Sequence, residues 1–457
     1  MLFNSSEFLA VFLPATLAGY WLASRAGLHL WFLVAASFAF YGYWDWRFEA
    51  LLVPSIVLNW TAAQAFLKTG RRWILHLMIV ADLTCLGIFK YAVFFSEVLG
   101  DATGMAFGLA QLALPLGISF FTFHHIIYLV DLLRGRAPSY SLRDYALYIV
   151  LFPQLIAGPL VRHSEIIHQF ALSPWRDGVA NRWSEGFSLL VIGLAKKMFL
   201  ANQLAPGADQ VFDLAGRGPV SLFDAWYGVL SFTFQIYFDF SAYSDMAIGI
   251  ALLFGFRLPI NFDAPYRALN VADFWRRWHM TLSRFLRDYL YIPLGGNRRG
   301  LPTQVIALMI TMVLGGLWHG AGWPFIIWGL LHGAALSIRV MLGRYFGWLP
   351  AQAAWLLTFL FVAITWVFFR APDIATANSL IIAMLGAGSA VPSTIVTSLN
   401  LQILAIAAAF ALIGPTSQII ASRKLRPWMA YGLGLAAAAI ATKIVSSPPE
   451  PFIYFQF

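Results

Sequence analysis

Residues 273–300 have the sequence DFWRRWHMTLSRFLRDYLYIPLGGNRRG, and residues 314–323 have the sequence LGGLWHGAGW. The first stretch is dense in arginine. The segment from Leu301 to Ile338 contains no Lys, Arg, Asp or Glu, yet it holds His319. A basic, amphipathic segment followed by an uncharged run with a histidine inside it indicates reaction chemistry placed within a membrane. We expect the rest of the chain to be the scaffold for that chemistry.

The composition of the whole chain is that of a polytopic membrane protein. Of its 457 residues, 60% are hydrophobic and 11% are charged, and the mean hydropathy is +0.72. Soluble domains carry about 25% charged residues. The net charge of +9 is therefore attributed to cytoplasmic loops that follow the positive-inside rule, and nucleic-acid binding is not expected. The single cysteine, Cys85, excludes an internal disulfide and a cysteine-based metal cluster.

Apolar runs of about 20 residues, the length that crosses a bilayer, recur along the chain. They predict an all-α protein with roughly 10–13 membrane spans, accompanied by re-entrant and interfacial amphipathic helices. Residues 105–130 are interrupted by Pro115 and Gly117, so two short or re-entrant helices are expected there. Because no internal repeat is visible, we expect a single domain over residues 1–457, with its catalytic core at about 225–340.

The distribution of charges predicts an orientation. Glu7 precedes the first apolar run and Arg25 follows it, which favours a retained first helix with its N-terminus outside. The arginine-rich region 267–299 is expected to face the cytoplasm.

On a helical wheel, residues 275–290 form one strongly amphipathic helix. The wheel places His279 on the apolar side. That side carries Trp275, Trp278, Leu282, Phe285, Leu286, Tyr289 and Leu290, and the polar side carries Arg276, Arg277, Arg284, Arg287 and Asp288. The arginines suit either a solvated face near anionic headgroups or a vestibule for a phosphate-bearing donor.

His319 has a different setting. Gly315, Gly316, Gly320 and Gly322 surround it, which favours a close approach of backbones and a broken helix. An intramembrane histidine is a functional-site hypothesis by default, and its ordinary pKa near 6.5 suits a proton acceptor at neutral pH. His332, which lacks the glycine setting, is better explained by helix packing.

Other polar groups in apolar runs have weaker signals. Asp239 and Asp245 are the only charges inside a long apolar span, where a proton relay, an ion site or a structural anchor is conceivable. The pairs His124–His125 and His163/His168 lack the spacing of a zinc motif, so no metal is expected.

The stretch FWRRWHMTLSRFLRDYLYIPLGGNRRG, followed by LGGLWHGAGWPFIIWGLLHG, resembles the signature of the membrane-bound O-acyltransferase (MBOAT) family. The resemblance is to its bacterial branch, which contains the alginate O-acetyltransferase membrane subunit and the teichoic-acid D-alanyl transfer protein. It extends through MLFNSSEFLAVFLP, LPLGISFFTFHHIIYLVD, FPQLIAGPLVR and YFDFSAYSDMAIG to the closing PFIYFQF, and so covers essentially the whole chain.

The resemblance implies a ring of membrane helices around a central tunnel in the bacterial inner membrane. It implies that His319, in LWHG, is the essential catalytic histidine and that His279, in WRRWH, is the second histidine of the site. An acyl thioester, either acetyl-CoA or an acyl-carrier phosphopantetheine, would be the donor, and no bound cofactor is expected. A polysaccharide acceptor and a periplasmic acetyltransferase or acyl-acceptor protein are the implied partners.

Substrate-binding roles are predicted for a further set of residues: Trp318, Trp275, Arg276, Arg277, Asp239, Tyr243 and Asn297. We hypothesise that His319 is a general base that activates an acceptor hydroxyl, while His279 orients the donor or polarises its carbonyl. Transfer of D-alanine or another acyl group, a covalent acyl-histidine, a transporter and a non-catalytic scaffold stay open as alternatives.

Overall fold

The computed structural model describes the chain except for residues 106–107, 110–111, 347, 391–394, 424–426, 447–449 and 454–457. The described residues form helices and no strand, which confirms the all-α prediction. Two compact units can be distinguished: Met1–Ile192 with Tyr243–Pro259 and Ala421–Pro451, and Gly193–Ala242 with Ile260–Ile420 and Phe452–Phe457. They are called the first and the second unit below. The single-domain organisation stays a prediction.

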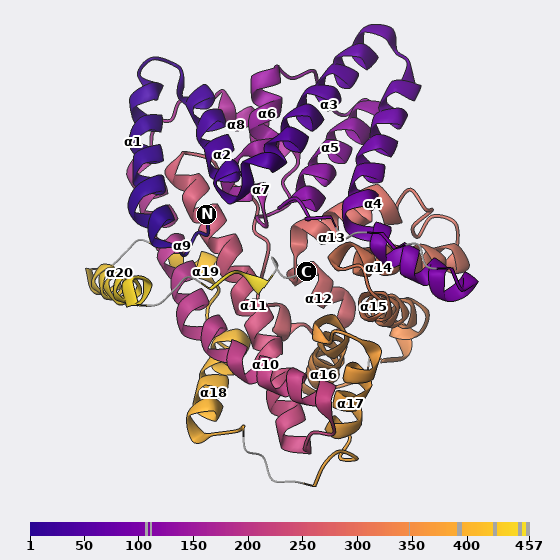
Figure 1. The fold of residues 1–457 in the computed structure, drawn as a ribbon. Helices are drawn as coiled ribbons and strands as arrows, with labels where there is room; N and C mark the ends of the chain where they lie inside the picture. Colours follow the sequence, from indigo (N-terminus) through magenta and orange to yellow (C-terminus); the bar gives the residue numbers. More distant parts are fainter. Residues whose placement is uncertain are drawn as a thin grey trace. The chain divides into compact units, whose positions relative to one another are not determined.

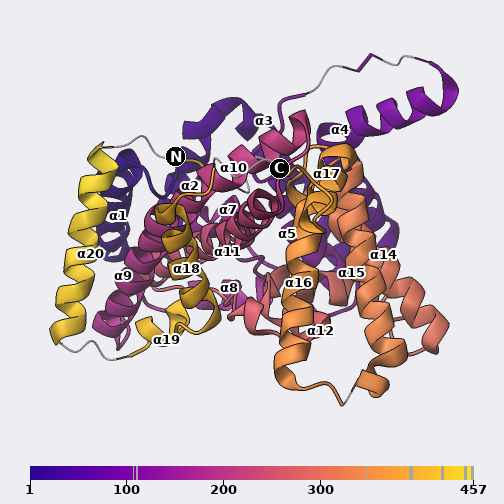
Figure 2. The same cartoon turned by 90° about the horizontal axis from the view of Figure 1, so that it is seen from below.

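Figures 1 and 2 show the helices of the first unit and its connections. Helix α1 packs on α2, α3 packs on α4, and α4 packs on α5. The bounds are η1 Glu7–Phe12, α1 Leu13–Ser24, α2 His29–Asp45, η2 Trp46–Phe48, α3 Glu49–Thr69, α4 Arg72–Thr103, α5 Ile118–Leu133, α6 Leu142–Val150, α7 Phe152–Leu155, α8 His163–Phe170, α9 Val179–Lys196, α19 Ser417–Ala421 and α20 Pro427–Ser446. Helix α9 continues into the second unit, and α19 begins there.

The second unit carries both histidines of the predicted site. Figure 2 shows its helices α14, α15 and α16 side by side, and α15 packs against both neighbours. The bounds are η3 Lys197–Ala201, α10 Asn202–Arg217, α11 Leu222–Leu253, η4 Pro265–Arg267, α12 Val271–Arg277, α13 Met280–Leu286, η5 Arg287–Tyr291, α14 Leu301–His319, α15 Trp323–Leu342, η6 Gly343–Phe346, α16 Ala351–Arg370, α17 Ile374–Met384 and α18 Ser398–Leu412. Residues 243–253 of α11 belong to the first unit.

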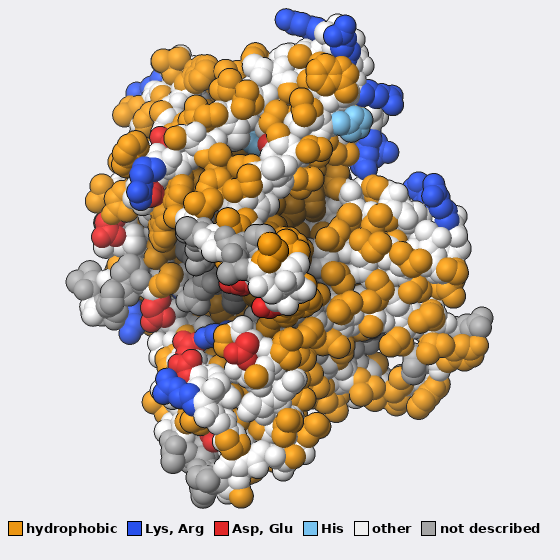
Figure 3. Space-filling view, turned by 45° about the vertical axis from the view of Figure 1, so that its right-hand side comes forward, with side chains coloured by type: hydrophobic (Ala, Val, Ile, Leu, Met, Phe, Trp, Pro, Cys, Tyr) orange, Lys and Arg blue, Asp and Glu red, His pale blue; other side chains and the backbone are white. Residues whose placement is uncertain are grey.

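Among the described residues, eight helical segments are long and apolar enough to cross a membrane. Three of them, Glu7–Ser24, His29–Thr69 and Val179–Arg217, contain more than one helix, and four shorter apolar helices accompany the eight. On the face drawn in Figure 3, hydrophobic side chains cover most of the surface and basic side chains gather in a few places. Such a surface suits a lipid environment, since polar side chains exposed to hydrocarbon are costly.

Two predictions about helices need correction. The amphipathic helix expected over residues 275–290 is interrupted at Trp278 and His279, which separate α12 from α13. The two short helices expected over residues 105–130 are replaced by one, α5, and the described residues between Met105 and Gly117 are not helical. Pro115 lacks the N–H that a helix needs, and Gly117 has a left-handed φ of 73°, so the helix begins only after them.

Candidate active site

His319 is the last residue of α14 and lies in an aromatic enclosure. Its side chain is almost fully buried, with 6% exposure. The ring centroids of Trp318, Trp328 and Phe369 lie 4.8, 5.3 and 5.1 Å from the imidazole. These rings come from α14, α15 and α16, so three neighbouring helices together fix the position of His319.

Glycines determine how closely α14 and α15 approach each other. A Cβ atom at Gly316 would overlap the carbonyl oxygen of Phe325, and one at Gly329 would overlap the carbonyl oxygen of Met312. Only glycine allows backbones to come this close. The glycines around His319 therefore serve both expected purposes: they seat α14 on α15, and residues Gly320–Gly322 end one helix before the next begins.

His279 is held by a different device. It precedes α13 and adopts φ 41° and ψ 53°, a left-handed conformation that is uncommon for a residue other than glycine. The buried Asn261 clamps the following turn. Its backbone carbonyl accepts a hydrogen bond from Met280 N at 2.9 Å, and its Oδ1 accepts from Thr281 N and Thr281 Oγ1 at 3.3 and 2.9 Å.

The structure brings the two histidines together around one indole. The ring of Trp318 lies 6.2 Å from His279 and 4.8 Å from His319. Phe240 of α11 and Phe262 flank His279 on other sides, with centroids at 4.7 and 6.4 Å. Two segments that are separate in the sequence thus present their imidazoles to a common aromatic centre.

His279 is 1% exposed, and this burial lowers its pKa to about 3. Removal from water penalises the charged imidazolium, so the imidazole is neutral at physiological pH. A neutral imidazole has one N–H donor and one acceptor nitrogen. His279 is therefore suited to orient or polarise a substrate group, and not to act as a fixed positive charge.

The predicted arginines separate into two kinds. Arg276 is exposed and lines a cavity of about 350 Å³ together with Arg287 and Arg339. Arg277 instead pairs with Asp273 at 3.1 Å, one turn earlier in α12, and lies 4.0 Å from Asp263. Arg277, which the wheel placed on the same side as Arg276, is thus held by carboxylates of the protein itself.

Asp239 serves as an internal anchor. Its Oδ1 lies 2.5 Å from Nζ of Lys197, and its Oδ2 accepts a hydrogen bond from the backbone N–H of Ile453 at 2.6 Å. All three groups belong to the second unit and are buried. The anchored groups are a lysine and a backbone amide near the C-terminus, and the substrate-binding role of Asp239 stays a prediction.

The remaining predicted residues lie in different surroundings. Trp275 is buried, lines the cavity beside Arg276 and donates a hydrogen bond to His332. Tyr243 belongs to the first unit, where its ring stacks on Phe3 with a centroid distance of 4.8 Å. The buried Asp245 belongs to the first unit as well. Asn297 is exposed in the turn between η5 and α14.

His332 is a structural histidine, as expected. Its Nδ1 accepts a hydrogen bond from Nε1 of Trp275 at 3.2 Å, and its Nε2 lies 3.1 Å from Oγ1 of Thr365. An indole N–H is a donor only, and the threonine hydroxyl already donates to the carbonyl of Val362. Nε2 must therefore carry the proton, and His332 links α12, α15 and α16.

Two histidines of the first unit also contact polar side chains through their ring nitrogens. His125 Nδ1 lies 2.6 Å from the hydroxyl of Tyr145, and His163 Nε2 lies 3.2 Å from Oδ2 of Asp131. Within the described ranges, no group of three His, Cys, Asp or Glu side chains is arranged to hold a metal ion.

Sequence reasoning missed Asn261, Phe240 and Phe369. Asn261 stands in the loop before the arginine-rich stretch and has no motif of its own. The two phenylalanines are ordinary members of apolar helices, so only the tertiary structure shows that they contact the histidines.

Comparison with known proteins shows the family to which the chain belongs. The model of the membrane-bound O-acyltransferase family matches residues 62–384. A peptidoglycan O-acetyltransferase of Helicobacter pylori is 42% identical over 425 residues, which cover 84% of this chain and 80% of that protein. A Pseudomonas aeruginosa protein named as an alginate O-acetylase, AlgI, is 41% identical over 408 residues, which cover 85% and 76%. A teichoic acid D-alanyltransferase of Streptococcus thermophilus is 29% identical over 238 residues, which cover 49% and 56%.

The chain belongs to the membrane-bound O-acyltransferase family. It is a multi-pass membrane acyltransferase. This family replaces the two other classes considered from the sequence, a transporter and a non-catalytic scaffold.

Proposed function

We propose that this protein transfers an acetyl group from a cytosolic thioester for the O-acetylation of an exported or cell-surface polysaccharide. The observation that carries the proposal is the convergence of two buried histidines on Trp318. The names of the relatives with high coverage, which refer to O-acetylation of peptidoglycan and of alginate, support acetyl as the group and a polysaccharide as the acceptor.

His319 acts in this proposal as the general base. It accepts the proton of an acceptor hydroxyl, the oxygen attacks the thioester carbonyl, and the thiolate leaves as the acyl oxygen bond forms. General-base assistance contributes about 10²–10⁴-fold to such a step. The neutral His279, across Trp318, orients the donor or polarises its carbonyl.

The cavity beside Arg276 is the proposed donor entrance. Arg276, Arg287 and Arg339 approach it from α12, η5 and α15, and Trp275 and Tyr291 provide flat rings. Guanidinium groups bind phosphate oxygens through paired hydrogen bonds. Coenzyme A and a carrier phosphopantetheine both bear phosphate, so these arginines suit either donor. By the positive-inside rule its basic end faces the cytoplasm of an inner membrane.

Transfer of D-alanine from a carrier protein is the second candidate. It is favoured by the D-alanyltransferase relatives, although these match only about half of this chain. An acceptor protein in the periplasm would complete delivery in either case.

The test is transfer of labelled acetyl from acetyl-CoA by the purified protein in liposomes. We compare wild type, His319→Ala and the matched control His76→Ala, which removes an exposed histidine of α4. Loss of transfer in His319→Ala alone, by about 10²-fold or more, supports the general base. Undiminished transfer by His319→Ala rules it out. If transfer occurs only from an acyl-loaded carrier protein, the donor is the carrier protein and not acetyl-CoA.

A further inference from the structure

Arg339 lines a second cavity besides the proposed donor entrance. This cavity has a volume of about 580 Å³ and lies between α12, α15 and α16 of the second unit. Its size falls within the range of about 300–1,000 Å³ that is typical of small-molecule sites.

Most of the lining is apolar and open to the surroundings of the helices. Leu269, Ile338 and Leu357 line it and are 45%, 47% and 57% exposed. Leu331 and Phe361 also line it and are half-buried. Ile338 and Leu357 belong to α15 and α16, which are long and apolar enough to cross a membrane, so we expect the bilayer to reach these two side chains.

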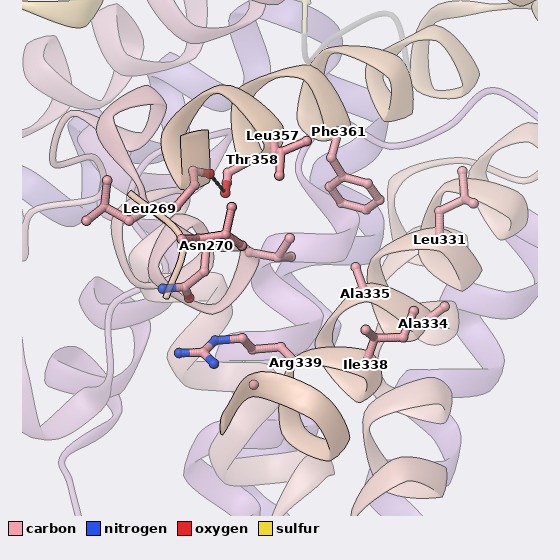
Figure 4. A pocket seen from close by; sticks show the side chains of 14 residues that line it. Leu269, Asn270, Leu331, Ala334, Ala335, Ile338, Arg339, Leu357, Thr358 and Phe361 are labelled. Atoms are coloured by element: carbon pink, nitrogen blue, oxygen red, sulfur yellow. Dashed lines mark hydrogen bonds between the residues drawn. The ribbon is translucent and has the colours of Figure 1, made fainter. Parts of the chain in front are cut away.

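One side of the cavity is polar. Figure 4 shows the guanidinium of Arg339 extending toward the side where Asn270 lies, with Phe361 and Leu331 across the cavity. The Oδ1 atom of Asn270 caps α12 by accepting from Asp273 N at 2.9 Å. The cap fixes the orientation of the amide, so Nδ2 is left as a donor. No acidic side chain is among the lining residues.

The depth of these groups matches a lipid molecule. Arg339 is in the last turn of α15, which ends at Leu342. The ends of a membrane-spanning helix lie near the headgroups. Leu331 is about two turns earlier in α15, which corresponds to about 12 Å toward the middle of the helix and of the membrane. A charged guanidinium and a neutral amide at headgroup depth thus adjoin the apolar part of the cavity.

We infer that this cavity binds an anionic phospholipid of the bilayer. Its phosphate would lie on Arg339 and Asn270, and one acyl chain would lie along Leu331 and Phe361. Because Arg339 also lines the donor entrance, the lipid would hold this arginine beside the entrance.

Native mass spectrometry of the purified full-length protein tests the inference. The protein is titrated with equal amounts of phosphatidylglycerol and phosphatidylethanolamine. We expect wild type to prefer the anionic lipid, and Arg339→Gln to lower that preference about tenfold, the loss expected for one charge-assisted hydrogen bond. Asn270→Asp, which keeps a good helix cap but repels phosphate, should act in the same direction. Arg298→Gln, an exposed arginine outside the cavity, is the matched control.

A phosphatidylglycerol with a photoreactive acyl chain gives a second measurement that does not depend on these variants. Cross-links should map to α15 and α16, and Leu357→Trp, which fills the cavity from its exposed side, should reduce them. Equal retention of both lipids by wild type, or an equal loss in Arg298→Gln, overturns the inference. Cross-links that map outside α15 and α16 also overturn it.

Discussion

The two histidines of the site are carried by opposite kinds of backbone. His319 ends a regular helix that is seated on its neighbour by glycines, whereas His279 occupies a left-handed position between two short helices. The first is positioned by packing of whole helices, and the second by a local clamp from Asn261. The comparison teaches that the site depends on two independent supports, which can be broken one at a time.

The largest effect is expected from separating α14 from α15. Gly329→Ala places a methyl group against the backbone of Met312 and Val313, so the helices must move apart. Such overpacking costs about 1–3 kcal/mol, and more when backbone must shift. We expect a lower thermal midpoint in detergent together with loss of acyl transfer.

The matched control for this prediction is Gly87→Ala in α4, where a Cβ meets nothing within 4 Å. Alanine is a better helix former than glycine by about 1 kcal/mol. The control should therefore be neutral or slightly more stable. If both variants behave alike, close helix packing is not what positions His319.

The next effect concerns the clamp on His279. Asn261→Ala removes the acceptor for Thr281 N and Thr281 Oγ1 in a buried place. Loss of a partner for buried donors costs about 1–3 kcal/mol. Asn261→Asp, which keeps the oxygen acceptor, should be milder. A double-mutant cycle with Thr281→Val should show coupling, and strict additivity would contradict the clamp.

The two supports, helix packing at His319 and the Asn261 clamp at His279, differ in how well the sequence predicts them. The uncharged run and its glycines predicted a helical break beside His319, because a cluster of glycines in an apolar run has few other uses. The break at His279 was not predictable in this way. Neither Trp278 nor His279 is a helix breaker, and the wheel pattern favours a continuous helix. The interruption is imposed by Asn261, which the sequence places in an earlier loop.

The same limit applies to the basic groups. The arginine-dense stretch suited either a solvated face or a vestibule. In the structure one of its arginines, Arg277, pairs with Asp273, and the cavity takes Arg339 from a helix beyond the stretch. Local charge density cannot show which side chains point into a common space. The likeness of several long motifs identified the family, and the geometry of the charged groups needed the tertiary structure.

A smaller effect is expected from pH. The pKa of His279 is near 6.5 in the unfolded chain and is lowered to about 3 by burial. Between these values the unfolded state binds a proton that the native state does not. His279 therefore lowers the free energy of unfolding as pH falls from about 6.5 toward 3, and it contributes about one proton to the slope. Unfolding in detergent between about pH 7 and about pH 5 should lose this contribution of about one proton in His279→Gln. An unchanged slope in that variant, or the same loss in His76→Gln, would contradict the assignment.

The smallest effect separates the backbone of His279 from its imidazole. A left-handed conformation costs a residue with a Cβ about 1–2 kcal/mol, and glycine avoids this cost. His279→Gly and His279→Ala both remove the imidazole, so their acyl-transfer rates should fall equally. Their stabilities should differ. The glycine variant gains about 1–2 kcal/mol of relieved strain and loses part of it, because glycine gives up more conformational entropy on folding, so it should be the more stable of the two. Denaturant titration of the two variants measures the difference directly. If alanine proves as stable as glycine, the left-handed turn is not strained, and the position of His279 must be attributed to its aromatic neighbours Phe240 and Trp318 instead of to the backbone.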